Sequence, residues 1–462
     1  MFHWTPYDVV PCSILLIGST ILMYLDFWSK VGIKTWYSPL VIGLAGLGSL
    51  VGQSLFSEST ELLAPSFEGL FLGILGLGWT AFRILCTNTF CLRGEWALPL
   101  MFLGGLLVMR SESSFGVIFG CEIGFIAMMG ACLSMSLNQK KIEALVKIFL
   151  MNLIGLVLGV LGAIFELVRQ ANDQSGLTIS STMDDRLFIG SQILLCFGFM
   201  GKAAVVPLCQ WLSDFLEAFG GKKGPLFMIL TLLSFLGFYR VLQLQTVWGI
   251  DMNVSQAAMI FIVVAHISAH MLASVQVNIY RFVGYWFAAQ LSLCALIAIV
   301  NGVDHSNGLQ EIMMVMILYL VLMSSVIWTL TLGFEAKGIN NLTFDDLLGL
   351  RVRSIWSFIG LLSFLVFLPC VFFSPGFLAL LALTKADFLE RFPYAFVLLA
   401  FAQMVPTYYG CRIFSAVWRA RPSYFLDSEY LPKFKNSDKG ILAGTVFFVL
   451  AVEIGVLCFH IV

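Results

Sequence analysis

Apolar stretches of roughly 20 residues recur along the whole chain, and short polar links separate them. A helix of that length crosses the ~30 Å hydrocarbon core of a bilayer and satisfies its own backbone hydrogen bonds. The sequence lacks the residue-by-residue alternation of a lipid-facing β-barrel. The pattern therefore predicts an all-α integral membrane protein with about fourteen transmembrane helices, near residues 8–27, 38–56, 65–86, 96–109, 113–135, 148–168, 187–207, 225–246, 255–275, 282–301, 311–333, 355–382, 394–416 and 440–460.

The composition agrees with lipid as the surrounding medium. Hydrophobic residues make up 59% of the chain and charged residues only 11%, whereas a soluble domain carries about 25% charged residues. The net charge of −1 gives no indication of a nucleic-acid partner. The eleven cysteines lie mostly singly and form no CxxC pair, so we expect no haem, iron–sulfur cluster or metal in the chain. No basic segment precedes the first apolar stretch, which indicates a retained helix.

The loop charges predict the orientation of the chain. When alternate loops are assigned to opposite sides of the membrane, seventeen of the 26 lysines and arginines lie on one side and five on the other. The positive-inside rule then places both termini on the periplasmic or intermembrane-space side.

Two ionisable residues lie well inside apolar stretches. Glu122 belongs to the predicted fifth span and Lys202 to the seventh. A charge within a bilayer costs several kcal/mol, so each such residue suggests a function. A glutamate and a lysine on facing helices could exchange stabilisation as protons come and go. The alternative is a static buried ion pair that fixes helix packing.

Prolines and histidines mark further candidate sites. Pro207 in the seventh span, and Pro369 and Pro375 in the twelfth, predict broken helices, which often lie at ion sites in transporters. The two spans are five apart, which fits an inverted five-helix repeat, although two unrelated kinks would leave the same pattern. His266 and His270 share one face of the ninth span and could relay protons or form interhelical hydrogen bonds. No metal-ligating neighbours accompany them.

Ordered motifs carry a family resemblance. Residues 93–133 start with Arg-Gly-Glu-Trp and reach the helix of Glu122, and the link that follows contains Glu-Ala and then Lys147. The run GFMGKAAVVPLCQWLSD holds Lys202, Pro207, Trp211 and Asp214. Two later links, SVQVNIYRFVGYW and TFDDLLGLRVRS, hold Gln276, Asn278, Arg281, Tyr285, Asp346, Gly349 and Leu350. In this order the motifs resemble the antiporter-like membrane subunits of NADH:quinone oxidoreductase (complex I), and the opening DVVPCSILLIGSTILMYLD is similar to the first helix of subunit 2, the bacterial subunit N.

The resemblance covers nearly the whole chain and implies a specific architecture. It implies two inverted five-helix repeats, spans 4–8 and 9–13, with helices 7 and 12 broken. The expected segments are a three-helix segment (1–90), a first repeat (91–246), a second repeat (247–418) and a C-terminal connection with the last helix (419–462).

The resemblance also implies an activity. Glu122 and Lys202 match the family's glutamate–lysine pair, which passes protons in a process coupled to quinone reduction in a neighbouring subunit, and Lys147 is a candidate for the same relay. FMN, iron–sulfur clusters and quinone would belong to partner subunits, and no cofactor or metal to this chain. The expected partners are other membrane-arm subunits and lipids, in the mitochondrial inner membrane or the bacterial cytoplasmic membrane.

The chain departs from the family pattern in the later helices. Cys209 and Gln290 stand where the family has histidines, residues 231–240 contain no lysine, and the lysine of the twelfth helix falls on Phe377 or Leu380. The nearest substitute is Lys385, at the expected membrane surface. We therefore expect a degenerate second half-channel.

Three alternatives to a proton-translocating subunit remain open at this point. They are a non-conducting structural spacer of the membrane arm, a subunit of a multisubunit cation/proton antiporter, and, as the weakest, an unrelated fourteen-span solute transporter.

Overall fold

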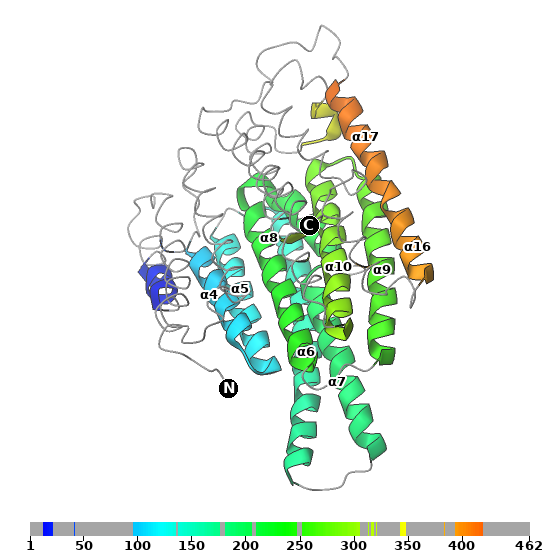
Figure 1. Ribbon diagram of the computed structural model, residues 1–462. Helices are drawn as coiled ribbons and strands as arrows, with labels where there is room; N and C mark the ends of the chain where they lie inside the picture. The colour runs from blue at the N-terminus through cyan, green and yellow to red at the C-terminus, as the bar shows by residue number, and fades with distance from the viewer. Residues whose placement is uncertain are drawn as a thin grey trace, which may run out of the picture. The chain divides into compact units, whose positions relative to one another are not determined.

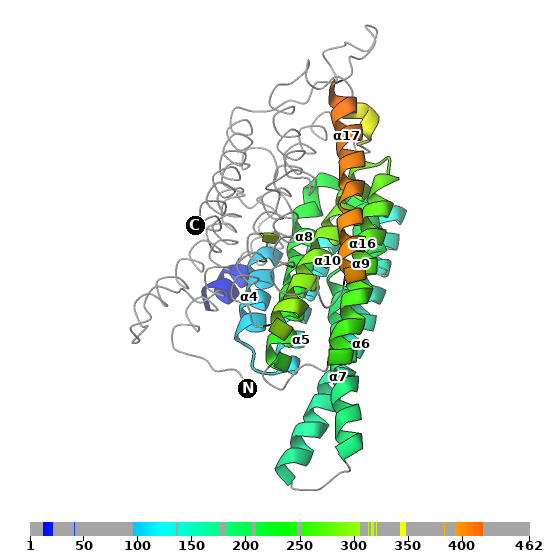
Figure 2. The same ribbon diagram turned by 45° about the vertical axis from the view of Figure 1, so that its right-hand side comes forward.

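A computed structural model describes residues 13–21, 41, 96–134, 137–175, 181–205, 209–246, 252–304, 342–347 and 393–418, together with residues 313, 316, 317, 320 and 383. These residues form helices, and the only strand-like pairing among them is an isolated bridge between Asn278 and Thr343. The helices are α4 (Ala97–Arg110), α5 (Ser114–Leu133), α6 (Gln139–Ser175), α7 (Ser181–Lys202), α8 (Gln210–Thr246), α9 (Met252–Ser274), α10 (Ile279–Asp304), the 3-10 helix η1 (Phe344–Leu347), α16 (Pro393–Ala402) and α17 (Met404–Trp418) (Figures 1 and 2).

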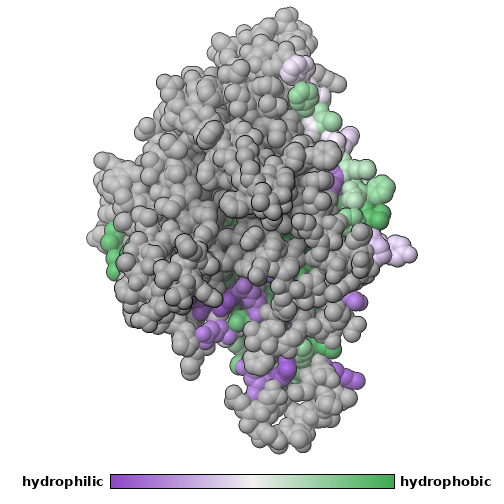
Figure 3. Space-filling view, in the orientation of Figure 1, coloured by the Kyte–Doolittle hydropathy of each residue, from purple (hydrophilic) through white to green (hydrophobic). Residues whose placement is uncertain are grey.

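Five helical stretches in the described part are long and apolar enough to cross a membrane: Ser114–Leu133, Gln139–Ala171, Met228–Gln245, Val254–Ser274 and Ile279–Asn301. Each coincides with a predicted span, so the all-α membrane class is confirmed. Large apolar side chains also remain exposed, as expected where lipid or another subunit covers a helix. On α16 and the start of α17 these are Tyr394, Val397, Leu398, Phe401 and Met404, and Figure 3 shows hydrophobic surface on that side.

The chain divides into two compact units. In the part described, the first unit holds α4, α5, α6, α7 and the later part of α8, and the second holds the first part of α8, most of α9, then α10, η1, α16 and α17. The domain boundaries predicted from the sequence stay predictions.

In the first unit the helices pack in two close pairs, α4 with α5 and α6 with α7. Ser113 caps the start of α5, where its Oγ accepts a hydrogen bond of 3.3 Å from the backbone N–H of Gly116. Helices α6 and α7 run past the ends of α4 and α5 (Figures 1 and 2). With 37 residues, α6 is about 55 Å long, so part of it lies beyond a ~30 Å hydrocarbon core.

Glycine makes the α6–α7 contact close. A Cβ atom added to Gly198 would lie 2.9 Å from the carbonyl oxygen of Gly155 and 2.9 Å from the backbone nitrogen of Gly159. Small residues of this kind let helices associate in a membrane, where no hydrophobic effect drives them together.

Helix α7 is interrupted directly after Lys202. Ala204 has a positive φ of 56°, a conformation that costs a non-glycine residue about 1–2 kcal/mol, and the helical path resumes at Gln210. Gly220, with φ 61° and ψ −157°, then breaks α8. Helix α7 ends before residue 207, where the sequence pattern placed the end of the seventh span, and the broken helices 7 and 12 stay predictions. Pro207, Pro369 and Pro375 lie outside the described residues.

In the second unit, α10 is the most enclosed of the membrane-crossing helices, and residues 282–300 are all buried. Figure 1 shows α9 beside α10 and α17 beside α9. Arg412 of α17 donates to the carbonyl oxygens of Ser274 and Gln276, at 3.1 and 3.0 Å, and so satisfies backbone acceptors at the C-terminal end of α9.

We expect Gly198→Leu to lower the free energy of unfolding by about 1–3 kcal/mol, because the new side chain meets the backbone of α6 and cannot move aside. The measurement is the thermal midpoint of the purified protein in detergent. Ile193→Leu, on a more exposed position of the same helix, is the control and should leave the midpoint unchanged. An unchanged midpoint for Gly198→Leu would contradict the close packing described here.

Candidate functional site

Glu122 of α5 and Lys202, the last residue of α7, form an ion pair in the first unit, between Lys202 Nζ and Glu122 Oε1. The side chain of Lys202 is 3% exposed and that of Glu122 is 17% exposed. Burying a single charge at such depth is very costly, and a partner of opposite sign in direct contact offsets much of that cost. The structure thus brings together the two residues that the sequence singled out.

Asn152 of α6 is a third member of the site. Its side-chain amide donates a hydrogen bond of 2.9 Å to Glu122 Oε2. Each carboxylate oxygen of Glu122 therefore has its own donor, a cation on one side and a neutral amide on the other. The sequence interpretation missed Asn152. The available signal was a polar amide within the apolar run KIFLMNLIGLVLG, where a side-chain amide needs a partner.

Local backbone structure positions Lys202. A Cβ atom on Gly155 of α6 would lie 2.8 Å from Lys202 Cγ and 3.2 Å from Lys202 Cε, so only glycine lets the lysine stem lie against α6. Lys202 is also the C-terminal residue of α7, where the helix dipole favours a positive charge. The break after Lys202 therefore leaves a cation at the end of a helix and next to a carboxylate.

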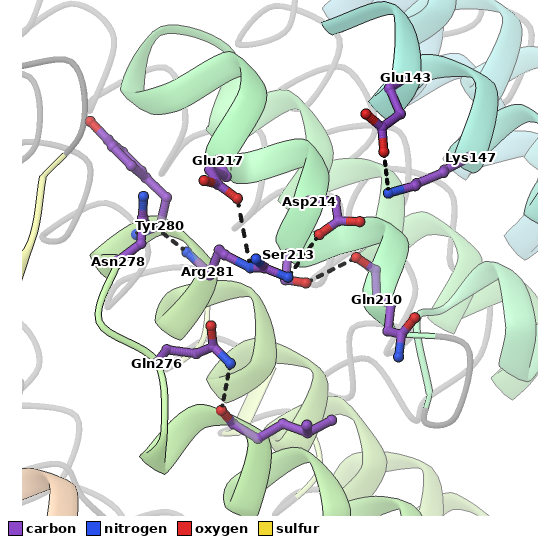
Figure 4. Close-up of polar contacts among 11 residues, drawn as sticks. Glu143, Lys147, Gln210, Ser213, Asp214, Glu217, Gln276, Asn278, Tyr280 and Arg281 are labelled. Atoms are coloured by element: carbon purple, nitrogen blue, oxygen red, sulfur yellow. Dashed lines mark hydrogen bonds and ion pairs between the residues drawn. The ribbon is translucent and has the colours of Figure 1, made fainter. Parts of the chain in front are cut away.

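Lys147 does not join this pair in the structure. It forms an ion pair of 2.8 Å with Glu143, one turn earlier on α6, and both side chains are largely exposed (Figure 4). Exposed pairs of this kind contribute little to stability. The predicted relay role of Lys147 remains a prediction.

The two histidines of α9 are fully buried in the second unit and lie edge to face, with ring centroids 4.5 Å apart. The Nε2 atom of His266 is 2.8 Å from the amide nitrogen of Gln403. Because that amide can only donate, Nε2 accepts, and Nδ1 carries the hydrogen that is donated to the carbonyl oxygen of Ala289 at 2.8 Å. Both nitrogens of His266 are thus engaged in hydrogen bonds within the second unit, and the relay role of His266 and His270 stays a prediction.

His270 differs from His266 in its hydrogen bonding. Its Nδ1 lies 3.1 Å from the hydroxyl oxygen of Tyr409, and its Nε2 has no hydrogen-bond partner within the described part of the chain. Gln290, at the position of a family histidine, is also buried. Among the described residues, no group of three or more histidine, cysteine or acidic side chains lies close enough to hold a metal ion.

Comparison with known proteins decides the family. The family described as "NADH:quinone oxidoreductase/Mrp antiporter, TM" matches residues 111–402, which is more than half of the chain. The chain belongs to this family. It is an antiporter-like membrane subunit of the kind found in complex I, Mrp antiporters and related complexes. No curated protein sequence matches the chain at a significant level.

Solved structures share the fold of this antiporter-like subunit. A chain of respiratory complex I from Thermus thermophilus with bound aureothin has a TM-score of 0.72 at 16% identity, with 96% of each chain covered. A chain of the membrane-bound sulfane sulfur reductase, an archaeal respiratory membrane complex, has a TM-score of 0.79 at 15% identity, with 98% of this chain and 95% of that chain covered. A chain of the Mrp complex from Dietzia sp. DQ12-45-1b has a TM-score of 0.72 at 12% identity, with coverage of 98% and 95%. At these identities the likeness shows the fold alone.

Two motifs of the antiporter-like subunit meet in the second unit. Arg281, near the start of α10, donates from Nη2 to Asp214 Oδ1 at 3.1 Å, and its Nε lies 3.7 Å from Glu217 Oε2 (Figure 4). The side-chain oxygen of Asn278 accepts from the backbone N–H of Tyr280 at 2.8 Å and so caps α10. The ion pair joins α10 to the part of α8 that precedes Gly220. Sequence reasoning named Asp214 and Arg281 as motif residues but did not predict their contact.

We expect Arg281→Gln to lower the thermal midpoint of the assembled subunit, because Asp214 and Glu217 lose their shared cation. The loss should be about 1 kcal/mol or less, since the arginine side chain is 37% exposed and solvent screens the pair. Lys140→Gln, which removes an exposed cation from α6, is the matched control. Equal midpoints for the two variants would show that the ion pair contributes nothing.

Proposed function

We propose that this chain is a proton-translocating subunit of the membrane arm of a complex I-type NADH:quinone oxidoreductase, of the subunit 2 kind. The observation that carries the proposal is the buried contact between Glu122 and Lys202 on α5 and α7. The family resemblance assigns the proton-input pair to these two residues, and the break in α7 directly follows the lysine.

The pair can hold or pass a proton without creating an isolated charge. When the proton moves from Lys202 to Glu122, an N–H bond of the ammonium breaks and an O–H bond forms at the carboxylate, which leaves a neutral amine and a neutral carboxylic acid. In a buried site the charged pair loses hydration and gains mutual attraction. A charge that arrives or leaves nearby would change this balance and so drive proton transfer within the pair.

The proposal includes the architecture predicted from the sequence. Fourteen spans would contain two inverted repeats, spans 4–8 and 9–13, and both termini would lie on the positive side of an energy-transducing membrane. Supporting observations are the five membrane-crossing helical stretches at predicted positions and the interruption of α7. Electron transfer through FMN, iron–sulfur clusters and quinone would take place in partner subunits, which this chain would contact together with lipids.

A second candidate is a subunit that joins neighbouring parts of the membrane arm without conducting protons. Residues 231–240 of α8 are buried up to Tyr239 and include no lysine. Arg240, the charged residue of that stretch, donates to the carbonyl oxygen of Ser111 at 3.0 Å. The residues considered for the lysine position of the predicted twelfth helix lie outside the described residues; they are Phe377, Leu380 and Lys385.

A cation/proton antiporter complex is the third candidate, because the family includes Mrp antiporters. Purification of the native assembly separates it from the first two. Flavin and iron–sulfur subunits that co-purify with this chain would support a complex I-type enzyme. An assembly without redox subunits would favour the antiporter.

We expect Lys202→Met to reduce the number of protons translocated per NADH oxidised, because methionine keeps much of the side-chain volume and removes the proton carrier. The proton step itself should slow by about tenfold or more, which corresponds to a barrier increase of at least about 1.4 kcal/mol. The measurement is the proton-to-electron stoichiometry of the complex in sealed vesicles, with Lys140→Met as the control. An unchanged stoichiometry in a fully assembled Lys202→Met complex would favour the non-conducting subunit.

A further inference from the structure

The carboxylate of Glu122 is held from two sides by donors of different kinds. Lys202 contacts Oε1, and the amide of Asn152 donates to Oε2 at 2.9 Å. The ammonium can lose its proton or swing away, whereas an amide does not titrate and keeps its donor at every pH. The two oxygens of Glu122 therefore differ in whether their partner can change.

Helix α6 fixes where that amide lies. Asn152 and Gly155 are three residues apart and share a face of α6. At Gly155 the helix packs against the stem of Lys202 and against the backbone of α7 at Gly198. The same helix face thus positions the lysine through close packing and the glutamate through a hydrogen bond, so a rotation of α6 would disturb both contacts.

We propose that Asn152 is a positioning residue that sets how tightly Glu122 binds a proton. By holding Oε2, the amide aims Oε1 at Lys202 and stabilises the carboxylate form even when the lysine is neutral or displaced. A hydrogen bond to the charged form of a carboxyl group favours that form. This inference rests on the proposed function, because it assigns Asn152 a role at the same proton-transfer pair.

The role can be separated from simple helix packing. If Asn152 only joined α5 to α6, its removal would lower stability and leave the pH profile of activity in place. If the Asn152 amide stabilises the carboxylate of Glu122, removal of that amide lets Glu122 bind a proton at a lower proton concentration. The pH profile of proton-coupled quinone reduction then moves to higher pH.

The test compares Asn152→Leu, which removes the donor at similar volume, with Asn152→Gln, which keeps a donor on a longer chain. Gln170→Leu is the matched control, because Gln170 donates to Glu166 Oε1 at 3.4 Å, also on α6. We expect Asn152→Leu to move the pH profile by about one unit, a tenfold change in proton affinity that equals about 1.4 kcal/mol. Asn152→Gln, which keeps a donor, should shift the pH profile less than Asn152→Leu does. Gln170→Leu should not shift it.

A second readout does not depend on proton translocation. The infrared carbonyl band of protonated Glu122, assigned in the purified complex by its loss in Glu122→Gln, reports the hydrogen bond at Oε2 directly. It should move in Asn152→Leu and stay in place in Gln170→Leu. Asn152→Ala serves as a second donor-free variant should the leucine variant fail to assemble.

The outcomes distinguish this inference from the proposed function. If the infrared band and the pH profile are both unchanged in Asn152→Leu and Asn152→Ala, the proposed role of Asn152 is wrong. If the band shifts in Asn152→Leu but the proton-to-electron stoichiometry is normal in Lys202→Met, Asn152 is a partner of Glu122 and the pair does not translocate protons. Equal shifts in Asn152→Leu and Gln170→Leu would show a general effect of α6 and would also overturn the proposal.

Discussion

One buried charge pair governs the first unit of this subunit. A chain with so few charged residues sits among apolar side chains and lipid, where an unpaired carboxylate or ammonium is very costly. Glu122 and Lys202 are tolerated because they touch each other and because Asn152 occupies the remaining carboxylate oxygen. Three helices, α5, α6 and α7, must therefore keep a fixed spacing, and the small residues between them make that spacing possible. The glycines of α6 and α7 are as much a part of the site as the charges.

The sequence identified the two charges and the helices that carry them, because ionisable side chains are rare within apolar runs and stand out. It also predicted an interruption near the end of the seventh span, although Ala204 and the helix end at Lys202 precede the proline that drew attention to it. Span positions followed from hydropathy alone, since each helix that crosses a membrane needs a minimum apolar length.

Other features depended on contacts that a linear pattern does not contain. Asn152 is neutral and looked like an ordinary polar residue until its distance to Glu122 was known. Lys147 shares the family motif but faces outward and pairs with Glu143. The spacing of His266 and His270 fits a proton relay and interhelical hydrogen bonds equally well. Only the positions of Ala289, Gln403 and Tyr409 show which ring nitrogens form hydrogen bonds. Sequence reasoning reached the Glu122–Lys202 pair through the family resemblance, but it did not reach contacts such as that of Asn152 with Glu122.

The most direct test of the account is a double-mutant cycle on the thermal stability of the assembled subunit, with Glu122→Gln, Lys202→Met and the two combined. Each single change leaves one buried charge without its partner, while the double change removes both. The account predicts that the double variant is more stable than the sum of the two single losses implies, by about 0.5–3 kcal/mol. Strictly additive losses would mean that the two side chains do not interact in the protein, and the proton-transfer site described here would have no basis.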